Sequence, residues 1–247
     1  MTATALRPRS ATEIIDASFQ LLRRHYTQLV AVAVVALLPY IVLVAVTGGT
    51  GSASPSALLV ILAQYLCAAL AEAAVIVGVS QAYLEGSVDI QHALVSTAGR
   101  LPTILLAGLL RGLAVLVGMV AFVFPGFYAA LRTFAIIPVV VLEEKSAGES
   151  FRRSWDLAKG EVWKVFVTLL LAWLIFFVLY LLLAMIAGML ASSNERASSL
   201  VVAMLLALVY PITGVVTTLL YYDIRVRREG FDLELLAREA APVAPSA

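Results

Sequence analysis

Residues 165–191 read VFVTLLLAWLIFFVLYLLLAMIAGMLA, a run of 27 residues without a charged side chain. A helix needs about 20 predominantly apolar residues to cross the roughly 30 Å of hydrocarbon in a bilayer. This run therefore predicts a transmembrane helix, and similar runs recur along the chain.

The composition of the whole chain also indicates that lipid surrounds most of it. Of its 247 residues, 62% are hydrophobic and 13% are charged, against roughly 45–50% and roughly 25% in ordinary globular chains. So few charges cannot cover a water-exposed surface, which argues against a soluble enzyme, a nucleic-acid-binding protein and a disordered chain. The net charge of +1 provides no field for polyanions. A single cysteine, Cys67, excludes an internal disulfide framework and a thiolate zinc site.

Six long, nearly uncharged runs predict six transmembrane helices in an all-α, polytopic fold. They cover approximately residues 26–47, 56–84, 101–124, 127–142, 165–191 and 199–222. Pro125-Gly126 marks a turn between the third and fourth runs. The fourth run has only 16 residues, so a tilted or re-entrant segment is an alternative to a full crossing there. Residues 1–9 are polar and no apolar core follows closely, so we expect no cleaved signal peptide.

The basic residues predict the orientation, because cytoplasmic loops retain Lys and Arg. In the six-span arrangement, Arg196 lies on one side, and Arg111 and Arg132 lie within spans. The other 14 of the 17 basic residues gather on the opposite side: Arg7, Arg9, Arg23, Arg24, Arg100, Lys145, Arg152, Arg153, Lys159, Lys164, Arg225, Arg227, Arg228 and Arg238. We therefore expect a multi-pass membrane protein with both termini in the cytoplasm.

The chain also shows a weak threefold internal repeat. A shift of 136 residues superposes Ser10 on Ser146 and Glu13 on Glu149, and a shift of 76 residues gives a weaker match. Each unit reads as an amphipathic helix followed by a hairpin of two spans. The units cover approximately residues 10–85, 86–145 and 146–228, within one membrane domain over 10–228; a polar tail (1–9) precedes it and a cytoplasmic segment (229–247) follows.

The amphipathic helix that leads each unit has readable local signals. Ser10 with Glu13, and Ser146 with Glu149, have the Ser-x-x-Glu spacing of a capping box. Ile14, Ile15, Ser18, Phe19 and Leu22 form one face of the first lead helix. We expect three such helices to lie in the cytoplasmic interface with the apolar face toward the acyl chains; the alternative is packing on the protein's own loops.

Three charged residues lie well inside predicted spans: Glu72, Arg111 and Arg132. Such a group is costly in hydrocarbon and should face a partner or a wet cavity. Glu72 and Arg111 lie at depths that differ by only about 3 Å, so they are candidates for a polar pair that is either structural or part of a pathway. Arg132 lies near the outer end of its span, where it could snorkel to the interface and contact lipid phosphate.

Signatures of an enzyme are lacking. The two histidines, His25 and His92, have no ligand at metal-binding spacing, and we expect them to be solvated at the interface. No GxSxG, Walker A, HExxH or GxGxxG sequence occurs. We expect no catalytic residue, no metal and no cofactor.

The end of the last span continues into a charged segment. Asp223 with Arg227, Arg225 with Glu229, and Arg228 with Asp232 are spaced i,i+4 and extend a helix, which Gly230 ends or bends. This segment is the candidate surface for docking a partner, and its candidate residues are Asp223, Arg225, Arg227, Arg228 and Glu229.

The tail from Tyr221 to Leu236 resembles the one that closes the membrane domain associated with glycerophosphoryl diester phosphodiesterases. Four further segments resemble the same family: Pro125-Gly126, Ala130-Leu131-Arg132, Pro138–Glu143 and Ser150–Gly160. The likeness covers most of residues 10–236. It implies a prokaryotic, polytopic protein of the bacterial inner membrane, often without the catalytic domain. The family's phosphodiesterase chemistry belongs to a soluble TIM barrel that uses histidines and metal-binding carboxylates. No stretch of this chain can form that barrel, so no catalytic residue is carried over.

Two functions are compatible with these observations. The first is a non-enzymatic membrane module that scaffolds or assists a lipid-active or membrane partner. The second is a transporter or lipid-handling protein with a polar cavity around Glu72 and Arg111. A membrane-embedded enzyme ranks third. The expected partners are membrane lipids and either another membrane protein or a second copy of this chain, and not nucleic acid.

Overall fold

The computed structural model describes residues 8–47, 55–190, 195–231 and 233. These residues form helices joined by short turns, without a strand among them, which confirms the all-α class. The helices are α1 (Ala11–Thr47), α2 (Pro55–Leu84), α3 (Ile90–Ala98), α4 (Leu101–Ala121), α5 (Val123–Arg132), α6 (Ile136–Leu142), α7 (Ala147–Leu157), α8 (Val162–Leu190) and α9 (Glu195–Glu229).

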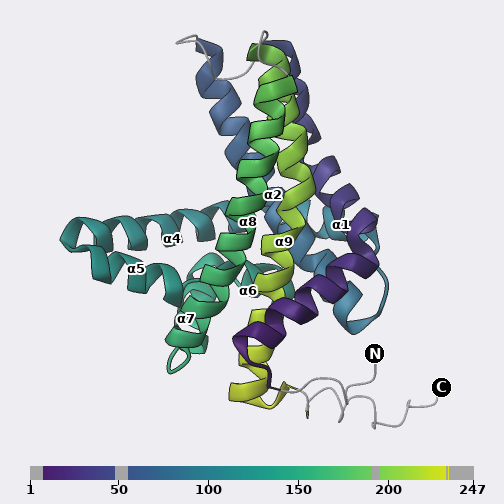
Figure 1. Ribbon diagram of the computed structural model, residues 1–247. Coiled ribbons are helices and arrows are strands. Elements are labelled where there is room, and N and C mark those ends of the chain that lie inside the picture. Colours follow the sequence, from purple (N-terminus) through teal and green to yellow (C-terminus); the bar gives the residue numbers. More distant parts are fainter. Residues whose placement is uncertain (1–7, 48–54, 191–194, 232, 234–247) are drawn as a thin grey trace, which may run out of the picture.

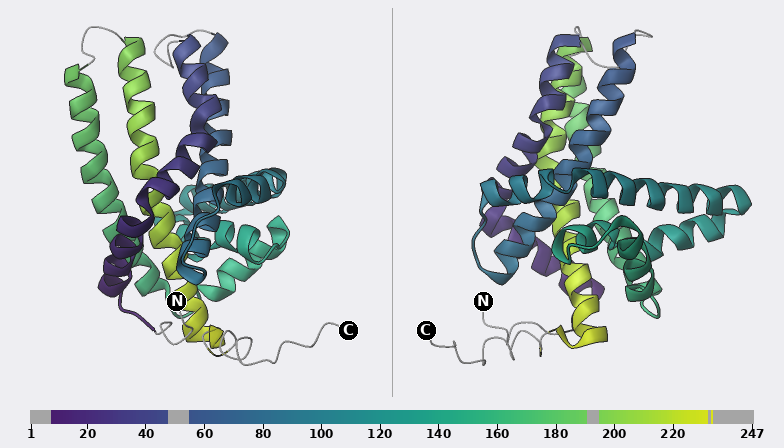
Figure 2. Two further views of the ribbon diagram at one scale, coloured as in Figure 1. Left: turned by 90° about the vertical axis from the view of Figure 1, so that its right-hand side faces the viewer. Right: turned by 180° about the vertical axis from the view of Figure 1, so that it is seen from behind.

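Long stretches of α1, α2, α8 and α9 run side by side and form a bundle (Figures 1 and 2). Helix α1 packs against α2 and α9, and α9 also packs against α2 and α8. By length and composition, six stretches of the described residues can cross a membrane, in agreement with the prediction: Ala11–Thr47, Leu58–Leu84, Leu101–Ala121, Val123–Leu142, Val162–Ile186 and Leu200–Glu229. The chain is a multi-pass membrane protein.

Helix α1 contains both a lead helix and a span. The two parts meet at His25, whose φ of −119° and ψ of 18° are not helical, and Figure 1 shows the change of direction. The 22 residues from Tyr26 to Thr47 extend for about 33 Å at 1.5 Å per residue, which matches the thickness of the hydrocarbon. The kink therefore separates a stretch long enough to cross the hydrocarbon from the lead helix that precedes it.

The expected capping boxes begin two of the lead helices. In α7 the Glu149 N–H donates to the Ser146 hydroxyl, and the Ser146 N–H donates to the Glu149 carboxylate at 3.1 Å. Ser10 and Glu13 form the same reciprocal pair at the start of α1, at 2.7 and 3.3 Å. In α3 the cap is Asp89, which accepts a hydrogen bond from the His92 N–H.

The apolar face of the first lead helix packs into the protein's own core. Ile14, Ile15, Ser18 and Leu22 are buried. Phe19, which we expected on the same face, is exposed. The interior of the protein therefore covers most of this face, and Phe19 lies at its border.

Helices α4 and α5 form a hairpin, here called the arm (Leu101–Arg132), that projects sideways from the bundle (Figures 1 and 2). Helix α4 is attached at its beginning, where Ile104 and Ala107 pack against Ala73 and Ile76 of α2. These are the buried residues of α4. The rest of α4 therefore packs mainly against α5.

The arm reverses direction at Phe122, not at Pro125-Gly126 as predicted. Phe122 is extended (φ −174°, ψ 151°), and Pro125 and Gly126 lie in the first turn of α5, where a helix tolerates proline. Gly126 has a packing role instead: a Cβ added to Gly118 would lie 2.6 Å from the Gly126 Cα. The pair of glycines lets the two helices approach closely near the tip.

The fourth predicted span is a broken segment. Helix α5 ends at Arg132, a turn covers residues 133–135, and α6 begins at Ile136. The residues of α6 from Ile136 to Val140 are buried among other helices. Half of this apolar run therefore belongs to the arm and the other half to the core of the protein.

Helix α9 continues beyond its apolar part into the charged segment and ends at Glu229. Gly230 follows with a φ of +64°, in the left-handed region that favours glycine, so the predicted end of the helix is confirmed. The order of one lead helix and one helical hairpin recurs three times along the chain. The threefold repeat itself stays a prediction, because the second hairpin has a different direction and a broken second helix.

Candidate functional site

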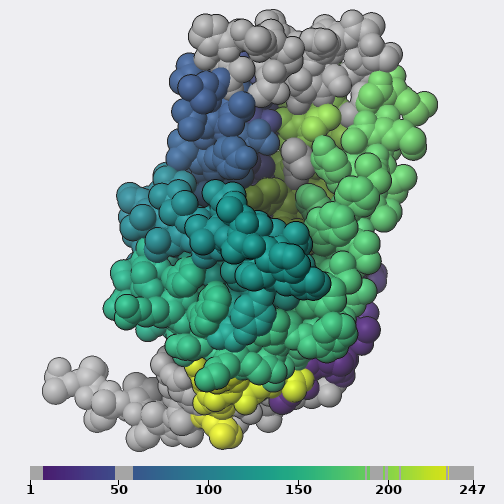
Figure 3. Space-filling model, turned by 90° about the vertical axis from the view of Figure 1, so that its left-hand side faces the viewer, coloured from purple at the N-terminus to yellow at the C-terminus, as the bar shows by residue number. Residues whose placement is uncertain are grey.

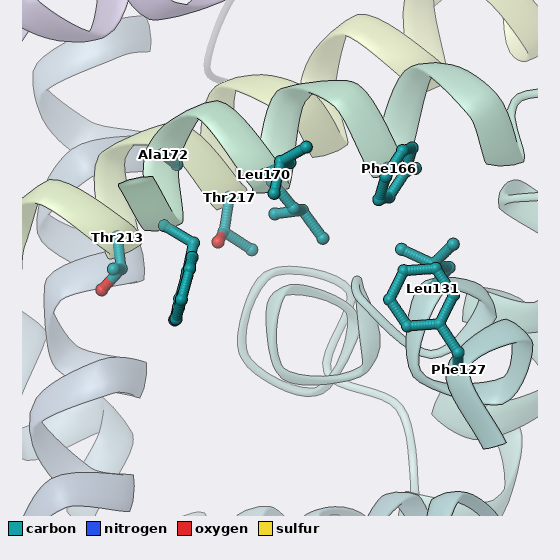
Figure 4. Close-up of a pocket in the computed structure, with 9 residues that line it drawn as sticks. Phe127, Leu131, Phe166, Leu170, Ala172, Thr213 and Thr217 are labelled. Carbon is teal, nitrogen blue, oxygen red and sulfur yellow. The ribbon is translucent and has the colours of Figure 1, made fainter. Parts of the chain in front are cut away.

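An apolar groove of about 430 Å³ lies between the arm and the bundle. Helices α5, α8 and α9 all contribute to it: its lining residues are Phe127, Leu131, Phe166, Leu169, Leu170, Ala172, Trp173, Thr213 and Thr217. Figure 4 shows Phe127 and Leu131 on one side of the space and Phe166 and Leu170 on the other. The polar atoms in its lining side chains are the hydroxyls of the two threonines and the indole N–H of Trp173. Thr213 Oγ1 donates to the carbonyl of Tyr210 at 3.1 Å.

Aromatic contacts hold α5 against α8 at one end of the groove. The rings of Phe127 and Phe166 meet edge to face with their centroids 5.5 Å apart, and Trp163 lies 5.4 Å from Phe166. Trp163 is exposed at the start of α8, as expected for an aromatic residue at a membrane boundary. The groove therefore extends along α8 from Phe166 toward Trp173.

Sequence reasoning did not identify this groove. Its lining comes from three helices that are distant in the chain, and its residue types are those of any lipid-facing surface. The only available signal was the aromatic content around Trp163, Phe166 and Trp173, which is equally typical of an interfacial belt.

Arg132 is buried at the end of α5, with 6% of its surface exposed. Its guanidinium lies over the rings of Trp155 and Tyr128, at 4.9 and 5.4 Å from their centroids. Its Nη1 donates to the Tyr128 hydroxyl at 2.9 Å, whereas its Nε finds no hydrogen-bond partner among the described residues. The expectation that Arg132 snorkels at the outer end of a span was wrong, since the side chain turns inward against α7.

Ser154 of α7 connects the same region through the backbone. Its hydroxyl donates to the Arg132 carbonyl at 3.0 Å and accepts from the Ala135 N–H at 3.1 Å. It thereby provides a hydrogen-bond partner for one backbone carbonyl and one backbone N–H at the turn between α5 and α6. Arg132 and Ser154 together attach the root of the arm to α7.

Glu72 and Arg111 are brought near each other by the attachment of α4 to α2. Arg111 lies four residues beyond Ala107, on the face of α4 that packs against α2. Arg111 is the opposite charge that acts on Glu72, and Tyr210 of α9 also experiences the charge of Glu72. Arg132 instead contacts Tyr128 and Trp155, so the three candidate residues belong to two different environments.

The candidate docking residues form a network at the end of the bundle. Asp223 is 5% exposed. It accepts hydrogen bonds from the Arg9 N–H at 2.5 Å and from Arg227 at 3.0 Å, and it pairs with Lys164 of α8. Arg225 binds Glu229 at 3.1 Å. Two of the three predicted i,i+4 pairs are thus present, and the third, Arg228 with Asp232, lies outside the described residues.

The same network extends to α6 and α7. Arg153 binds Glu143 at 3.0 Å and also pairs with Glu229, while the Tyr221 hydroxyl donates to Glu143 at 2.8 Å. Burial opposes the charge on Arg153, but its hydrogen bond to Glu229 and the charge of Glu143 outweigh this effect and raise the pKa of Arg153. Arg228 donates to the carbonyl of Lys159. The ends of five helices are tied together here.

The histidines lie in polar surroundings, as expected. His25 Nδ1 is 3.0 Å from the Gln28 side chain, and His92 Nδ1 is 3.0 Å from that of Gln81. His92 lines a second cavity of about 200 Å³ between α2, α3 and α6, which also contains Arg100 in an ion pair with Glu144 at 2.7 Å. Within the described ranges, no group of three or more His, Cys, Asp or Glu residues is arranged to hold a metal ion.

Comparison with known proteins gives a family match for this arrangement. The model of the family described as the membrane domain of glycerophosphoryl diester phosphodiesterase matches residues 100–226. No curated protein and no solved structure matches the chain significantly. The matched residues run from the start of the arm almost to the end of α9 and therefore include every residue of the groove. Because they make up more than half of the chain, the protein belongs to the family of membrane domains of glycerophosphoryl diester phosphodiesterase.

Proposed function

We propose that this protein is a non-catalytic membrane module that holds membrane lipid and assists a lipid-active partner. The family description names a membrane domain of an enzyme, not its catalytic part. Glycerophosphoryl diesters contain the glycerol and headgroup of phospholipids, so this description favours a role close to lipid chemistry.

The groove between α5, α8 and α9 is the observation that carries the lipid part of the proposal. Its volume of about 430 Å³ lies in the range of about 300–1,000 Å³ found for sites that bind small ligands. Its walls are aliphatic and aromatic, and charged side chains are absent from its described lining. Such walls suit an acyl chain and offer no charge to stabilise an ionic substrate.

A photoactivatable phospholipid tests the lipid part. Purified protein in lipid nanodiscs is irradiated with a phospholipid that carries a diazirine in one acyl chain, and the cross-linked residues are identified by mass spectrometry. We expect cross-links at the groove in wild type and their loss in Leu170→Trp, which fills the groove. Leu174→Trp is the matched control, because Leu174 is similarly exposed on α8 but does not line the groove. Equal labelling of the groove in all three proteins would contradict the proposal.

The partner part of the proposal involves the charged end of α9. Of the five candidate docking residues, Arg227, Arg228 and Glu229 are exposed, whereas Asp223 is buried in the network. The exposed arginines are therefore the groups within reach of an acidic partner surface. They are proposed as the docking contacts. The ion pairs of Asp223 and Arg225 hold this end of α9 in place.

Co-purification tests this docking surface. We expect wild-type protein, extracted in mild detergent from its native membrane, to retain activity that hydrolyses glycerophosphoryl diesters. The double variant Arg227→Gln/Arg228→Gln should lose it. Arg23→Gln/Arg24→Gln is the control, since this pair is also basic and exposed but lies on α1. Wild-type protein without hydrolytic activity, or unchanged recovery in the first variant, would count against the partner.

The alternative of a transporter or lipid-handling protein is favoured by the surroundings of Glu72. Arg111 and Tyr210 lie within electrostatic reach of this carboxyl group. Figure 3 shows that the face from which the arm projects is hollowed between α2 and α8, just above the arm. Glu72→Gln in reconstituted vesicles tests this function: transbilayer movement of a fluorescent phospholipid should fall relative to wild type, and unchanged movement would exclude a pathway through Glu72.

A further inference from the structure

The surface of the arm beyond its root is apolar on all sides. Residues 112–131 contain no charged side chain, and Arg111 and Arg132 border this stretch at its two ends. Large apolar side chains are exposed along both helices and at the tip: Leu113, Leu116, Val117, Val120, Phe122, Val123, Phe124 and Phe127. Val120 reaches 81% exposure. A docked protein would cover only one face of a helix pair. The arm exposes apolar side chains in several directions, and an apolar solvent is needed to cover all of them.

The root of the arm lies deep along the bundle. The apolar part of α2 begins at Leu58, and the arm attaches at Ala73 and Ile76. At 1.5 Å per residue these positions lie about 23 and 27 Å from Leu58. A hydrocarbon core of about 30 Å that begins at Leu58 therefore ends just beyond the arm. The arm leaves the bundle within the second leaflet, on the side where the described N-terminal and C-terminal segments lie.

The direction and length of the arm do not fit a crossing from this depth. Helix α4 runs across the bundle and not along it (Figures 1 and 2). The returning helix, α5, has 10 residues, which extend for about 15 Å, or half of the hydrocarbon. The next helix, α6, is buried in the protein and contributes no lipid-facing length.

We infer that the arm is a one-leaflet element, which lies among the acyl chains of the cytoplasmic leaflet and does not cross the bilayer. The acyl chains of that single leaflet cover its exposed apolar surface. Arg111 and Arg132 remain at the root, where α2 and α7 contact the arm and the polar headgroups are near. On this account four stretches, in α1, α2, α8 and α9, cross the membrane. The inference does not depend on whether the groove holds a lipid.

Cysteine labelling tests the inference in cells that express the full chain. In a Cys67→Ala background, single cysteines are placed at Phe122 and Val120 near the tip of the arm. Met189 and Val95 serve as the controls for the two aqueous sides. Met189 is exposed near the end of α8, remote from the first described residues of α1 and from the end of α9, and Val95 is exposed on α3. Each variant is treated with a membrane-impermeant maleimide, in intact cells and in inverted vesicles. A maleimide reacts only with a thiolate, which a cysteine in hydrocarbon does not form. Contact with lipid is therefore measured in the Cys67→Ala parent, by irradiation with a phospholipid that carries a diazirine in one acyl chain.

We expect Met189→Cys to react from outside and Val95→Cys only in inverted vesicles. Phe122→Cys and Val120→Cys should react with neither impermeant treatment, and the irradiated phospholipid should cross-link to the tip of the arm in the parent. Reaction of the tip from outside would show that the arm crosses the membrane, and reaction in inverted vesicles would place it in water. Absence of lipid cross-links at the tip would show that protein covers it. Each of these three results would overturn the inference, and two tip positions guard against a single variant that misfolds.

Discussion

Buried charges are compensated in two different ways in this protein. Asp223 is surrounded by cations and by a backbone N–H, in a network that joins α8 to α9. Arg132 instead lies against two aromatic rings, those of Trp155 and Tyr128, which attract a cation through their quadrupoles. In the first arrangement, opposite charges neutralise the buried carboxylate. In the second, aromatic rings and one hydrogen bond to a hydroxyl stabilise the buried cation.

The first prediction concerns Asp223. Asp223→Asn should destabilise the protein by about 3–5 kcal/mol, because it leaves the half-buried Lys164 without an opposite charge. Thermal unfolding in detergent, followed by circular dichroism, measures the loss. The double variant Asp223→Asn/Lys164→Met should recover part of the stability, since it removes both charges. A single variant as stable as wild type would show that the network contributes little.

The second prediction concerns the pH dependence of the cap on α7. Hydrogen bonds from the Ser146 hydroxyl and N–H lower the pKa of Glu149 below 4.5. A carboxyl group with a lowered pKa stabilises the folded state at higher pH and loses this contribution as the pH falls through the lowered value. Amide exchange in the first turn of α7 should therefore become less protected below about pH 4.5. Glu149→Gln should remove this pH dependence; a persistent step would assign it to another group.

Local spacing explains which residue contacts could be predicted. The capping boxes and the two i,i+4 pairs join residues three or four positions apart, and helix geometry alone brings such residues together. Arg132 depends on Trp155, which belongs to another helix. Nothing in the local pattern could reveal that contact, so the sequence suggested snorkelling instead.

At the scale of the elements, the lengths of the apolar runs predicted the long helices correctly. The position of the hairpin turn could not be predicted from its residue types. Pro125-Gly126 predicted a turn, yet proline is also favoured in the first turn of a helix, where its missing N–H costs nothing. The actual reversal at Phe122 lacks proline and glycine. The close approach of Gly118 and Gly126 explains why glycine is present there without a left-handed backbone.

The third prediction compares two glycines on α4. Gly118→Ala should destabilise the arm, because its Cβ would lie 2.6 Å from the backbone of Gly126. Gly112→Ala should be neutral or stabilise the helix by up to about 1 kcal/mol, since its Cβ meets nothing within 4 Å. Amide exchange along α4 and α5 distinguishes the two variants. Similar exchange in both would show that the close packing at the tip is not needed.

At the scale of the whole molecule, hydropathy predicted how many apolar helices the chain contains but not the direction in which each one runs. The directions of α1, α2, α8 and α9 follow from their mutual packing. The direction of the arm depends on the contacts of α4 with α2, α6 and α7, which include that of Ile104 and Ala107 with α2. Such a contact joins residues some 30 positions apart and leaves no periodic signal. The groove was equally hidden, because it forms only when the arm lies beside α8.

The fourth prediction compares a lysine in the arm with one in the bundle. Val178→Lys on α8 places a charge near the centre of the bilayer, which costs about 2.5–3.5 kcal/mol. Val117→Lys on the arm should cost less, because the side chain can reach the nearby headgroups. Both valines are exposed on the protein surface. The yield of folded protein in the membrane, compared by fluorescence size-exclusion chromatography, should be lower for Val178→Lys, and the reverse order would contradict the depth assigned to the arm.

A depth profile of the arm tests the central claim most directly. Spin labels are attached one at a time to cysteines across residues 112–131 in lipid nanodiscs, and the ratio of oxygen to nickel-chelate accessibility gives the depth of each label. An arm that lies in one leaflet predicts depths that stay in that leaflet and vary only with the helical period of 3.6 residues. Depths that instead advance by about 1.5 Å per residue along α4 and reach the opposite headgroups would contradict it.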